Sequence, residues 1–186
     1  MDAIETIIAR RTIPVVRPDP IPRNVVERLL TAAAQAPNHH KVRPWRFIVL
    51  QGAARERLGA VMADALHTSN PEMPQAGLDK ERAKPLRAPL LIAVGVDLPQ
   101  EPRVEEVENI CAAAAAVENM LLAAESLGLG AIWRSGAAIS CPAVKTFLGL
   151  QVDQPLIGIL YLGYPAPGFP IIVERPSFED RTVWME

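Results

Sequence analysis

Two guanidinium groups and a hydroxyl stand together at Arg10, Arg11 and Thr12, where a short helical pattern over residues 2–11 ends. Guanidinium groups form paired hydrogen bonds with phosphate, so this cluster could hold a phosphate group. The same two arginines also suit the C-terminal end of a helix, where cations offset the helix dipole. On their own these residues leave both interpretations open, and the helix-end interpretation is the simpler one.

A second cluster lies at residues 128–136, which read GLGAIWRSG. Glycine lets a backbone turn sharply or approach a ligand closely. Beyond the glycines, Trp133, Arg134 and Ser135 offer an aromatic face for stacking and groups for hydrogen bonding. A glycine pair is also what an ordinary helix-to-strand turn needs, and this stretch lacks the full dinucleotide-binding fingerprint. The pattern alone therefore favours a turn.

The third cluster is the polar, proline-bounded stretch from Gln35 to Arg43, which runs directly into an apolar strand at residues 47–50. Polar loops at the edge of a strand are common places for binding sites. Its two histidines, His39 and His40, are adjacent and would point apart in an extended chain. The third histidine, His67, has no cysteine or carboxylate at ligand spacing. We therefore expect no metal site.

One long helical pattern between residues 104 and 128 must position these clusters. Its apolar residues recur at three- and four-residue spacings, which predicts one helical face made of Val104, Val107, Cys111, Ala114, Val117, Leu121 and Ala124. The opposite side is poor in charge over residues 112–116, so we expect the middle of the helix to be buried nearly all round. A membrane span is the competing interpretation. Glu108, Glu118 and Glu125 break the run short of the ~18 to 20 apolar residues that a span needs.

The other elements indicate an α+β fold around a sheet of four or five strands. We predict helices at residues 2–11, 24–33, 53–66 and 142–148, and strands at 47–50, 90–96, 131–133 and 156–162. The continuous apolar run at 90–96 predicts a central strand covered on both faces. Residues 69–89 mix charge, proline and glycine with little periodicity, so we expect a mobile segment. It would be a connector or a lid that shapes a pocket.

Composition narrows the class of protein and of partner. The chain has 186 residues and 49% hydrophobic content, which suits one domain spanning 1–186. A net charge of -2 and a pI near 6.0 argue against nucleic acid or an anionic membrane as a partner and favour small molecules. Cys111 and Cys141 form neither a disulfide framework nor a C-x-x-C pair, and we expect a cytoplasmic protein. A G-x-S-x-G motif is also missing from the sequence, so we assign no nucleophilic serine or cysteine.

The last stretch, residues 164–186, is unlike the rest of the chain. It combines four prolines with the apolar residues Ile171, Ile172, Val173, Phe178 and Trp184, and it cannot form a core of its own. Its apolar side chains need a surface to cover. We expect an arm that packs on a second subunit, and an arm that wraps its own domain is the alternative.

Three stretches together resemble the FMN-dependent nitroreductase family, in particular its small single-domain NAD(P)H nitroreductase-like branch: residues 10–12, residues 37–47 (PNHHKVRPWRF) and residues 128–136. The resemblance covers nearly the whole chain, since residues 162–165 and the C-terminal arm also fit. It implies an α+β homodimer of nitroreductase-like fold, with a mixed or antiparallel sheet and the long helix as the dimer core. FMN would lie at the subunit interface, reduced by NADH or NADPH. Nitroaromatics, quinones or similar small acceptors would reoxidise it by a ping-pong mechanism.

The resemblance also implies roles for individual residues. Arg10, Arg11 and Thr12 of one subunit would hold the ribityl phosphate, and Trp133, Arg134 and Ser135 would line the same FMN. Gln35 and His39 would come from the other subunit. Because the flavin carries the reaction, no side chain needs to act as a general acid or base, and we assign none as catalytic.

Two residues depart from the pattern of many family members, which carry a basic residue at Pro14 and a glutamine at Arg43. The first bears on phosphate binding and the second on acceptor choice. We hypothesise that Arg43 and Arg134 lie near the cofactor and favour the anionic reduced flavin. The alternatives from other classes are a flavin- or ligand-binding module that is not an enzyme, and an interaction protein whose arm is its function.

Overall fold

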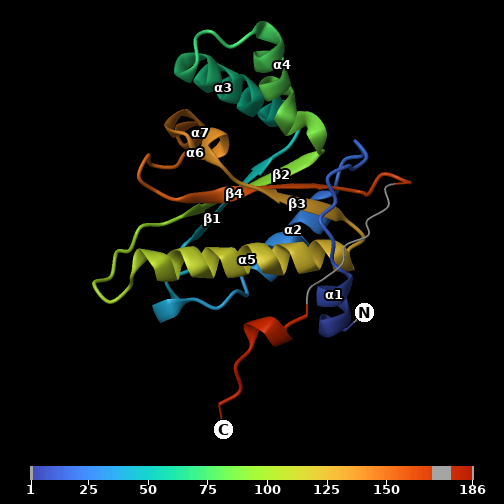
Figure 1. Ribbon diagram of the computed structural model, residues 1–186, viewed down its shortest axis with the longest axis vertical. Coiled ribbons are helices and arrows are strands. Elements are labelled where there is room, and N and C mark those ends of the chain that lie inside the picture. The colour runs from blue at the N-terminus through green and yellow to red at the C-terminus, as the bar shows by residue number, and fades with distance from the viewer. Residues whose placement is uncertain (1, 169–176, 186) are drawn as a thin grey trace.

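The computed structural model describes residues 2–168 and 177–185, and it has a four-stranded sheet between two layers of helices (Figure 1). The strands are β1 (Trp45–Leu50), β2 (Leu90–Val96), β3 (Gly130–Arg134) and β4 (Leu156–Gly163). The helices are α1 (Ala3–Ala9), α2 (Arg23–Ala33), α3 (Ala53–Ser69), α4 (Gln75–Ala83), α5 (Glu106–Ser126), α6 (Ala137–Ser140) and α7 (Pro142–Phe147). Short 3-10 helices are η1 (His39–Lys41), η2 (Lys84–Arg87) and η3 (Glu179–Arg181). The predicted α+β class is confirmed.

The sheet has the order β1-β2-β4-β3, and every neighbouring pair is antiparallel. Strand β2 lies inside the sheet and all seven of its residues are buried, as its apolar run predicted. Its register joins Phe47 to Val94 on one side and Leu160 to Ile92 on the other. Strand β3 is therefore an edge strand, paired only with β4 among the named strands of the described chain.

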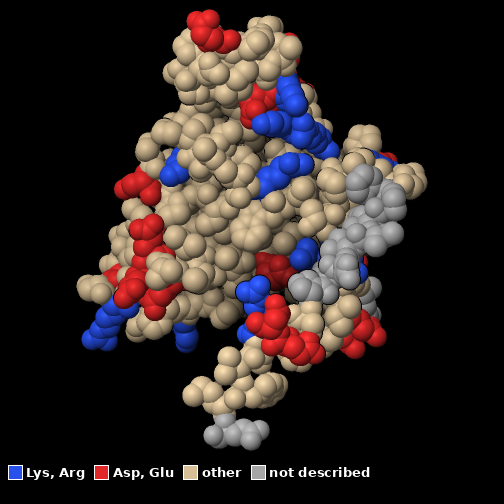
Figure 2. Space-filling model, in the orientation of Figure 1, with Lys and Arg blue, Asp and Glu red and all other residues tan. Residues whose placement is uncertain are grey.

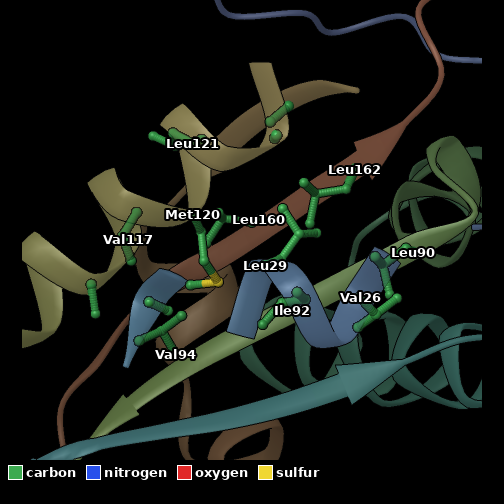
Figure 3. Close-up of a cluster of buried hydrophobic side chains, with 14 of the residues drawn as sticks. Val26, Leu29, Leu90, Ile92, Val94, Val117, Met120, Leu121, Leu160 and Leu162 are labelled. Atoms are coloured by element: carbon green, nitrogen blue, oxygen red, sulfur yellow. The ribbon is translucent and has the colours of Figure 1, made fainter. Parts of the chain in front are cut away.

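The layer of α2 and α5 covers one face of the sheet and encloses the larger core (Figure 3). Side chains from both helices meet side chains from β2 and β4 there, and several are fully buried: Leu29, Ile92, Val117, Met120 and Leu160. Helix α5 starts with a capping box, in which the Glu105 side chain and the Glu108 side chain each accept from the other residue's backbone. Small residues in its middle let it lie close to the sheet.

The predicted stripe of the long helix is wrong at Val107 and Cys111, whereas most of its other members are buried as predicted: Val104, Val117, Leu121 and Ala124. Val107 is 57% exposed and Cys111 is exposed, whereas the buried side runs through Ala113, Ala116 and Met120. At residues 112–116 every position is buried or half-buried within the described chain, so the predicted burial of the middle of the helix is largely confirmed. Helix α5 is long and apolar enough to pass a length-and-composition test for a membrane span, but its buried side packs against the sheet as the core helix of the fold.

The other face of the sheet is covered by α3, α6 and α7, which enclose a second core. The buried side chains of this core include Leu58, Met62, Val144, Leu148, Ile159 and Tyr161. Tyr161 is the one residue of this set with a polar group. Strand β4 contributes to both cores, with Leu160 and Leu162 in the larger one and Ile159 and Tyr161 in the second.

The segment at residues 69–89, which was expected to be mobile, contains α4 and η2, and its mobility stays a prediction. Helix α4 packs on α3 at Gly59, where an added Cβ would lie 2.1 Å from the carbonyl oxygen of Arg82. The sequence of α4 is polar, and the helix buries Glu81, which is 6% exposed. Contact with α3 rather than an apolar period of its own therefore stabilises this helix.

The predicted C-terminal arm is only partly described. Its first residues pair with their own chain, since Val16 bridges Pro165 and Ala166 donates its backbone N–H to the carbonyl of Val15. Residues 169–176, which hold much of its apolar sequence, lie outside the described residues. Residues 177–185 lead away from the helices and the sheet (Figure 1), with Trp184 80% exposed. That the arm packs on a partner stays a prediction.

Candidate functional site

A pocket of about 400 Å³ lies where β3 ends, between the sheet, α6 and η2. Three of the predicted residues, Trp133, Arg134 and Ser135, line it. Apolar side chains such as Met62 and Ile139 form part of the wall, and charged side chains form another part. In Figure 2, basic side chains gather on this side of the molecule, where α4 meets the sheet. The pocket therefore combines an aromatic ring, an apolar wall and a charged end.

Pairing between β3 and β4 sets the position of Trp133. Trp133 is opposite Leu160, and its indole Nε1 donates to the carbonyl oxygen of Ile157 at 3.1 Å. Gly158 makes this approach possible, because a Cβ at this position would lie 2.3 Å from that same Nε1. The φ of Gly158 is +150°, which is also a conformation that glycine adopts more readily than other residues. The indole stays 41% exposed and offers a face for stacking.

Arg134 and Tyr161 form the next part of the wall. The Arg134 guanidinium lies 5.4 Å from the centre of the Tyr161 ring, a cation-π distance. The buried Nε of Arg134 has no hydrogen-bond partner among the described residues. Burial raises the pKa of Tyr161, and the charges of Arg134 and Arg87 oppose that rise. The phenol is therefore protonated at neutral pH and can donate a hydrogen bond.

The charged end of the pocket is built by α4 and η2. Glu81 pairs through Oε2 with the ammonium of Lys84, three residues further along. Its other oxygen, Oε1, is buried and has no partner within residues 2–168 and 177–185. Arg87 also lines the pocket. Three cations, Lys84, Arg87 and Arg134, thus face one carboxylate in the part of the chain that the structure describes, which favours an anionic or electron-rich ligand.

The segment from Arg10 to Thr12 lies beside the start of β3. Thr12 forms a parallel bridge with Ala131, and the backbone N–H of Ile13 donates to the Ala131 carbonyl at 2.9 Å. Arg10 pairs with Glu118 on α5, with 3.5 Å between Nε and Oε1. The Nη1 of Arg11 donates to carbonyl groups at the end of α1, including that of Ala9 at 2.9 Å. Arg11 therefore adopts the helix-end role, and its binding to phosphate stays a prediction.

Gln35 and His39 lie elsewhere on the molecule. Gln35 follows α2, is exposed, and donates to the Thr31 carbonyl at 3.4 Å. His39 lies beside the start of α5, with its Nε2 3.9 Å from an oxygen of Glu108. Glu118, which pairs with Arg10, is ten residues further along that helix, a separation of about 15 Å at 1.5 Å per residue. The described chain therefore does not bring His39 together with Arg10 and Thr12.

The loop that carries His39 has an unusual backbone. His40, Lys41 and Arg43 have φ values of 46°, 58° and 50°, in the left-handed region that side chains with a Cβ rarely occupy. The expectation that the two histidines point apart is wrong, because their ring centres are 4.2 Å apart. Among the described residues no group of three or more His, Cys, Asp and Glu could hold a metal ion. Arg43 lies in this loop and not in the pocket that contains Arg134.

Sequence reasoning did not name four polar residues of the pocket: Glu81, Lys84, Arg87 and Tyr161. It did offer residues 69–89, which contain the first three, as a connector or a lid that shapes a pocket. The first three lie in or beside α4, whose polar sequence gave no periodic signal. Tyr161 did carry a signal, since it is the one hydroxyl in the apolar run LIGILYL. A hydroxyl on a buried strand usually finds a polar partner or faces a cavity, and here it faces the pocket.

An antiparallel sheet between two helical layers defines an α+β protein, and the cationic and aromatic pocket at the end of its edge strand is a candidate small-molecule site. Residues 7–164 match the Nitroreductase family. A relative from Escherichia coli strain K12 named "Putative NAD(P)H nitroreductase YdjA" is 36% identical over 166 residues, with 89% of each chain covered. The chain belongs to the nitroreductase family.

Solved structures agree on the fold. A nitroreductase-like family protein from Bacillus cereus superposes with a TM-score of 0.83 at 23% identity, covering 100% of this chain and 97% of that one. A nitroreductase with bound FMN from Bacteroides fragilis superposes with a TM-score of 0.77 at 25% identity, with 100% of both chains covered. The predicted nitroreductase-like fold is confirmed.

Proposed function

We propose that this protein is an FMN-dependent oxidoreductase that takes electrons from NADH or NADPH. Its acceptors would be nitroaromatics, quinones or similar small molecules. The observation that carries the proposal is the pocket at the end of β3, where Trp133 and Arg134 of the family-like stretch meet a buried charged cluster. Support also comes from the relatives, one of which binds FMN and another of which is named "Putative NAD(P)H nitroreductase YdjA".

The residues of the pocket fit FMN in kind. The isoalloxazine ring is flat and aromatic, and Trp133 offers a stacking face beside an apolar wall. Its carbonyl groups need donors, and the buried Nε of Arg134 is a donor without a partner among the described residues. Arg10, Arg11 and Thr12 would hold the phosphate at the other end of β3, which requires Arg11 to release the carbonyl groups of α1. Bound FMN would supply hydride acceptance from the nicotinamide and electron delivery to the acceptor, in a ping-pong sequence.

The proposed assembly is a cytoplasmic homodimer of one domain, residues 1–186, in which the arm of residues 164–186 packs on the partner. Exposed apolar residues support it, since Val107 on α5 and Trp184 in the arm are 57% and 80% exposed. Gln35 and His39 would then reach the FMN of the partner subunit. Both cysteines are free, which suits a reducing compartment.

The first test is the visible spectrum of the purified protein after FMN is added and the excess is removed by desalting. The proposal expects bound flavin, and bleaching of its absorbance when NADH or NADPH is added without oxygen. Arg134→Ala should retain at least about tenfold less FMN, because it removes a charged hydrogen-bond donor. Arg46→Ala is the matched control, since Arg46 pairs with Asp97 in a different pocket. A colourless wild-type protein would overturn the proposal.

The same experiment separates the enzyme from its main alternative. A flavin that stays bound but is not bleached by either nicotinamide would indicate a binding module without reductase activity. A bleached flavin that no acceptor reoxidises faster than oxygen does would indicate the same. The proposed enzyme instead shows both half-reactions, and its rates differ among acceptors.

A second test addresses the shared site. Chains carrying Arg134→Ala and chains carrying His39→Ala are produced separately and together. If His39 serves the FMN of the partner, a heterodimer has one site with both residues intact and one with neither, so co-production restores about half of the FMN binding per heterodimer. If His39 and Arg134 served the same chain's FMN, every site would lack one of them, and co-production would restore nothing.

A further inference from the structure

Glu81 lines the pocket, and the proposed function assigns it no role. It is a carboxylate that is 6% exposed, on a helix whose other side chains are mostly exposed. Its Oε2 contacts Lys84, while its Oε1 is buried without a hydrogen-bond partner in the described chain. A buried carboxylate oxygen without a hydrogen-bond donor lowers the stability of the folded protein. Such an oxygen is most easily explained where a bound ligand supplies the missing donor.

The surroundings of Glu81 indicate what kind of donor it needs. On one side the pocket is aromatic and apolar, with Trp133, Ile132 and Met62 in its wall, which suits a flat ring rather than a sugar chain. At the charged end, the Lys84 ammonium and the Arg134 Nε are donors. The pocket thus presents two donor groups and one acceptor that can each reach a ring edge. Rotation about the last bond of the Glu81 side chain is soft, so either carboxylate oxygen can face the pocket.

The oxidised isoalloxazine ring has one N–H group, at N3, and this group lies between the carbonyl groups at C2 and C4. Its edge therefore reads acceptor, donor, acceptor. A carboxylate can accept from the N–H group, and donors on either side of the carboxylate can donate to the two carbonyl groups. Resting on the proposed function, we propose that Glu81 accepts a hydrogen bond from the N3–H group of FMN, with Lys84 and Arg134 donating to the neighbouring carbonyl groups. Glu81 is then the residue that recognises the ring edge.

The test compares the affinity of the full-length protein for FMN and for FMN methylated at N3, by quenching of flavin fluorescence. Wild type should bind FMN about 10- to 100-fold more tightly than the methylated flavin, because a hydrogen bond to a charged group is lost. In Glu81→Ala the preference should fall to within about threefold, since the shortened side chain leaves room for the methyl group. Glu81→Gln keeps an acceptor without the charge and should show a preference of about two- to tenfold.

Two controls keep the result interpretable. Glu27→Gln changes a carboxylate that pairs with Arg23 at 2.8 Å on the exposed side of α2, and it should keep the wild-type preference. Circular dichroism and melting temperatures establish that each variant is folded, and Glu81→Gln preserves the shape of the side chain if Glu81→Ala does not fold.

The outcomes separate the inference from the proposed function. Equal binding of the two flavins by wild type, or an unchanged preference in Glu81→Ala, overturns the role of Glu81 and leaves the flavoprotein standing. A lower FMN affinity in Glu81→Ala with an unchanged preference would assign the carboxylate to the ribityl hydroxyl groups instead and would equally overturn it. A wild-type chain that binds neither flavin overturns the proposed function, and the inference falls with it.

Discussion

Substituting Gly59 with alanine tests the packing that places the charged end of the pocket. The added Cβ would lie 2.1 Å from the carbonyl oxygen of Arg82 and 3.1 Å from its carbonyl carbon. Both atoms are backbone and cannot rotate away, so α4 has to move by roughly 1 Å to restore a normal contact. Overpacking of this kind lowers the free energy of unfolding by about 1 to 3 kcal/mol. Because the contact is so short, we expect a loss near the upper end of this range.

Helix propensity acts in the other direction. Alanine is favoured over glycine by about 1 kcal/mol in a helix interior, which leaves a net loss of about 2 kcal/mol for Gly59→Ala. For a chain of this size, each kcal/mol shifts the melting temperature by about 2 to 4 °C, so the variant should melt about 4 to 8 °C below wild type. The movement also displaces Glu81 and Lys84, and FMN affinity should fall with it.

Thermal unfolding followed by circular dichroism measures this effect, and Gly77→Ala is the matched control. Gly77 is also helical, but its added Cβ would meet only the side chain of Met73, with the sulfur 2.6 Å away. A methionine side chain can move aside, so Gly77→Ala should melt at the wild-type temperature or up to about 4 °C above it. If Gly59→Ala melts at or above the melting temperature of Gly77→Ala, the close packing of α3 on α4 at Gly59 is refuted.

Three other changes test the fold and its titration. Burial raises the pKa of Tyr161 above its usual value of 10.0, so the folded protein keeps the phenol proton at a pH where the unfolded chain has lost it. The free energy of unfolding should therefore fall as pH rises past the pKa of the unfolded chain. Between about pH 9 and about pH 11, urea unfolding of Tyr161→Phe should show a smaller fall than wild type. Asp2→Ala removes the side chain that caps α1 and should cost about 1 kcal/mol, with faster amide exchange confined to that helix. Met120→Ala empties a fully buried position and should cost about 2 to 5 kcal/mol, whereas Val152→Ala, at an exposed position, should stay within about 0.5 kcal/mol.

The sequence was most informative where apolar residues are continuous or periodic. Strands β2 and β4 were predicted from runs such as LLIAVGV, because a strand covered on both faces has no polar positions. The length of α5 was also predicted. Its buried side was predicted only in part, since a run of five alanines at 112–116 gives no contrast between faces, and the packing of α2 and the sheet decides which alanines are buried.

Helix α4 shows what local reasoning lacks. The sequence QAGLDKERA has one large apolar residue, Leu78, and no apolar stripe. Its position depends on Gly59, which is 23 residues from Arg82 in the chain, and on burial of Glu81 beside Lys84. Long-range contacts of this kind carry no local signal, so sequence reasoning could not place the residue types that α4 brings to the pocket.

The candidate site was therefore predicted in part. Trp133, Arg134 and Ser135 were assigned to the site by the family resemblance, because their residue types alone favoured an ordinary turn, and they do share one pocket. Arg11 was expected to bind phosphate, whereas its guanidinium contacts the end of α1. Residue types alone cannot choose between these two roles, because the helix end and the phosphate both offer oxygen atoms to the same donor.

The bridge between Thr12 and Ala131 has a consequence for how the chain is completed during synthesis. The N-terminal segment leaves the ribosome first, but its partner on β3 is made 119 residues later. At about 5 to 20 residues per second, the segment that flanks the proposed cofactor site waits about 6 to 24 s for the strand against which it lies. The site therefore closes late, after the sheet-facing side of α5 has been made, and a chain stalled before residue 131 cannot form it.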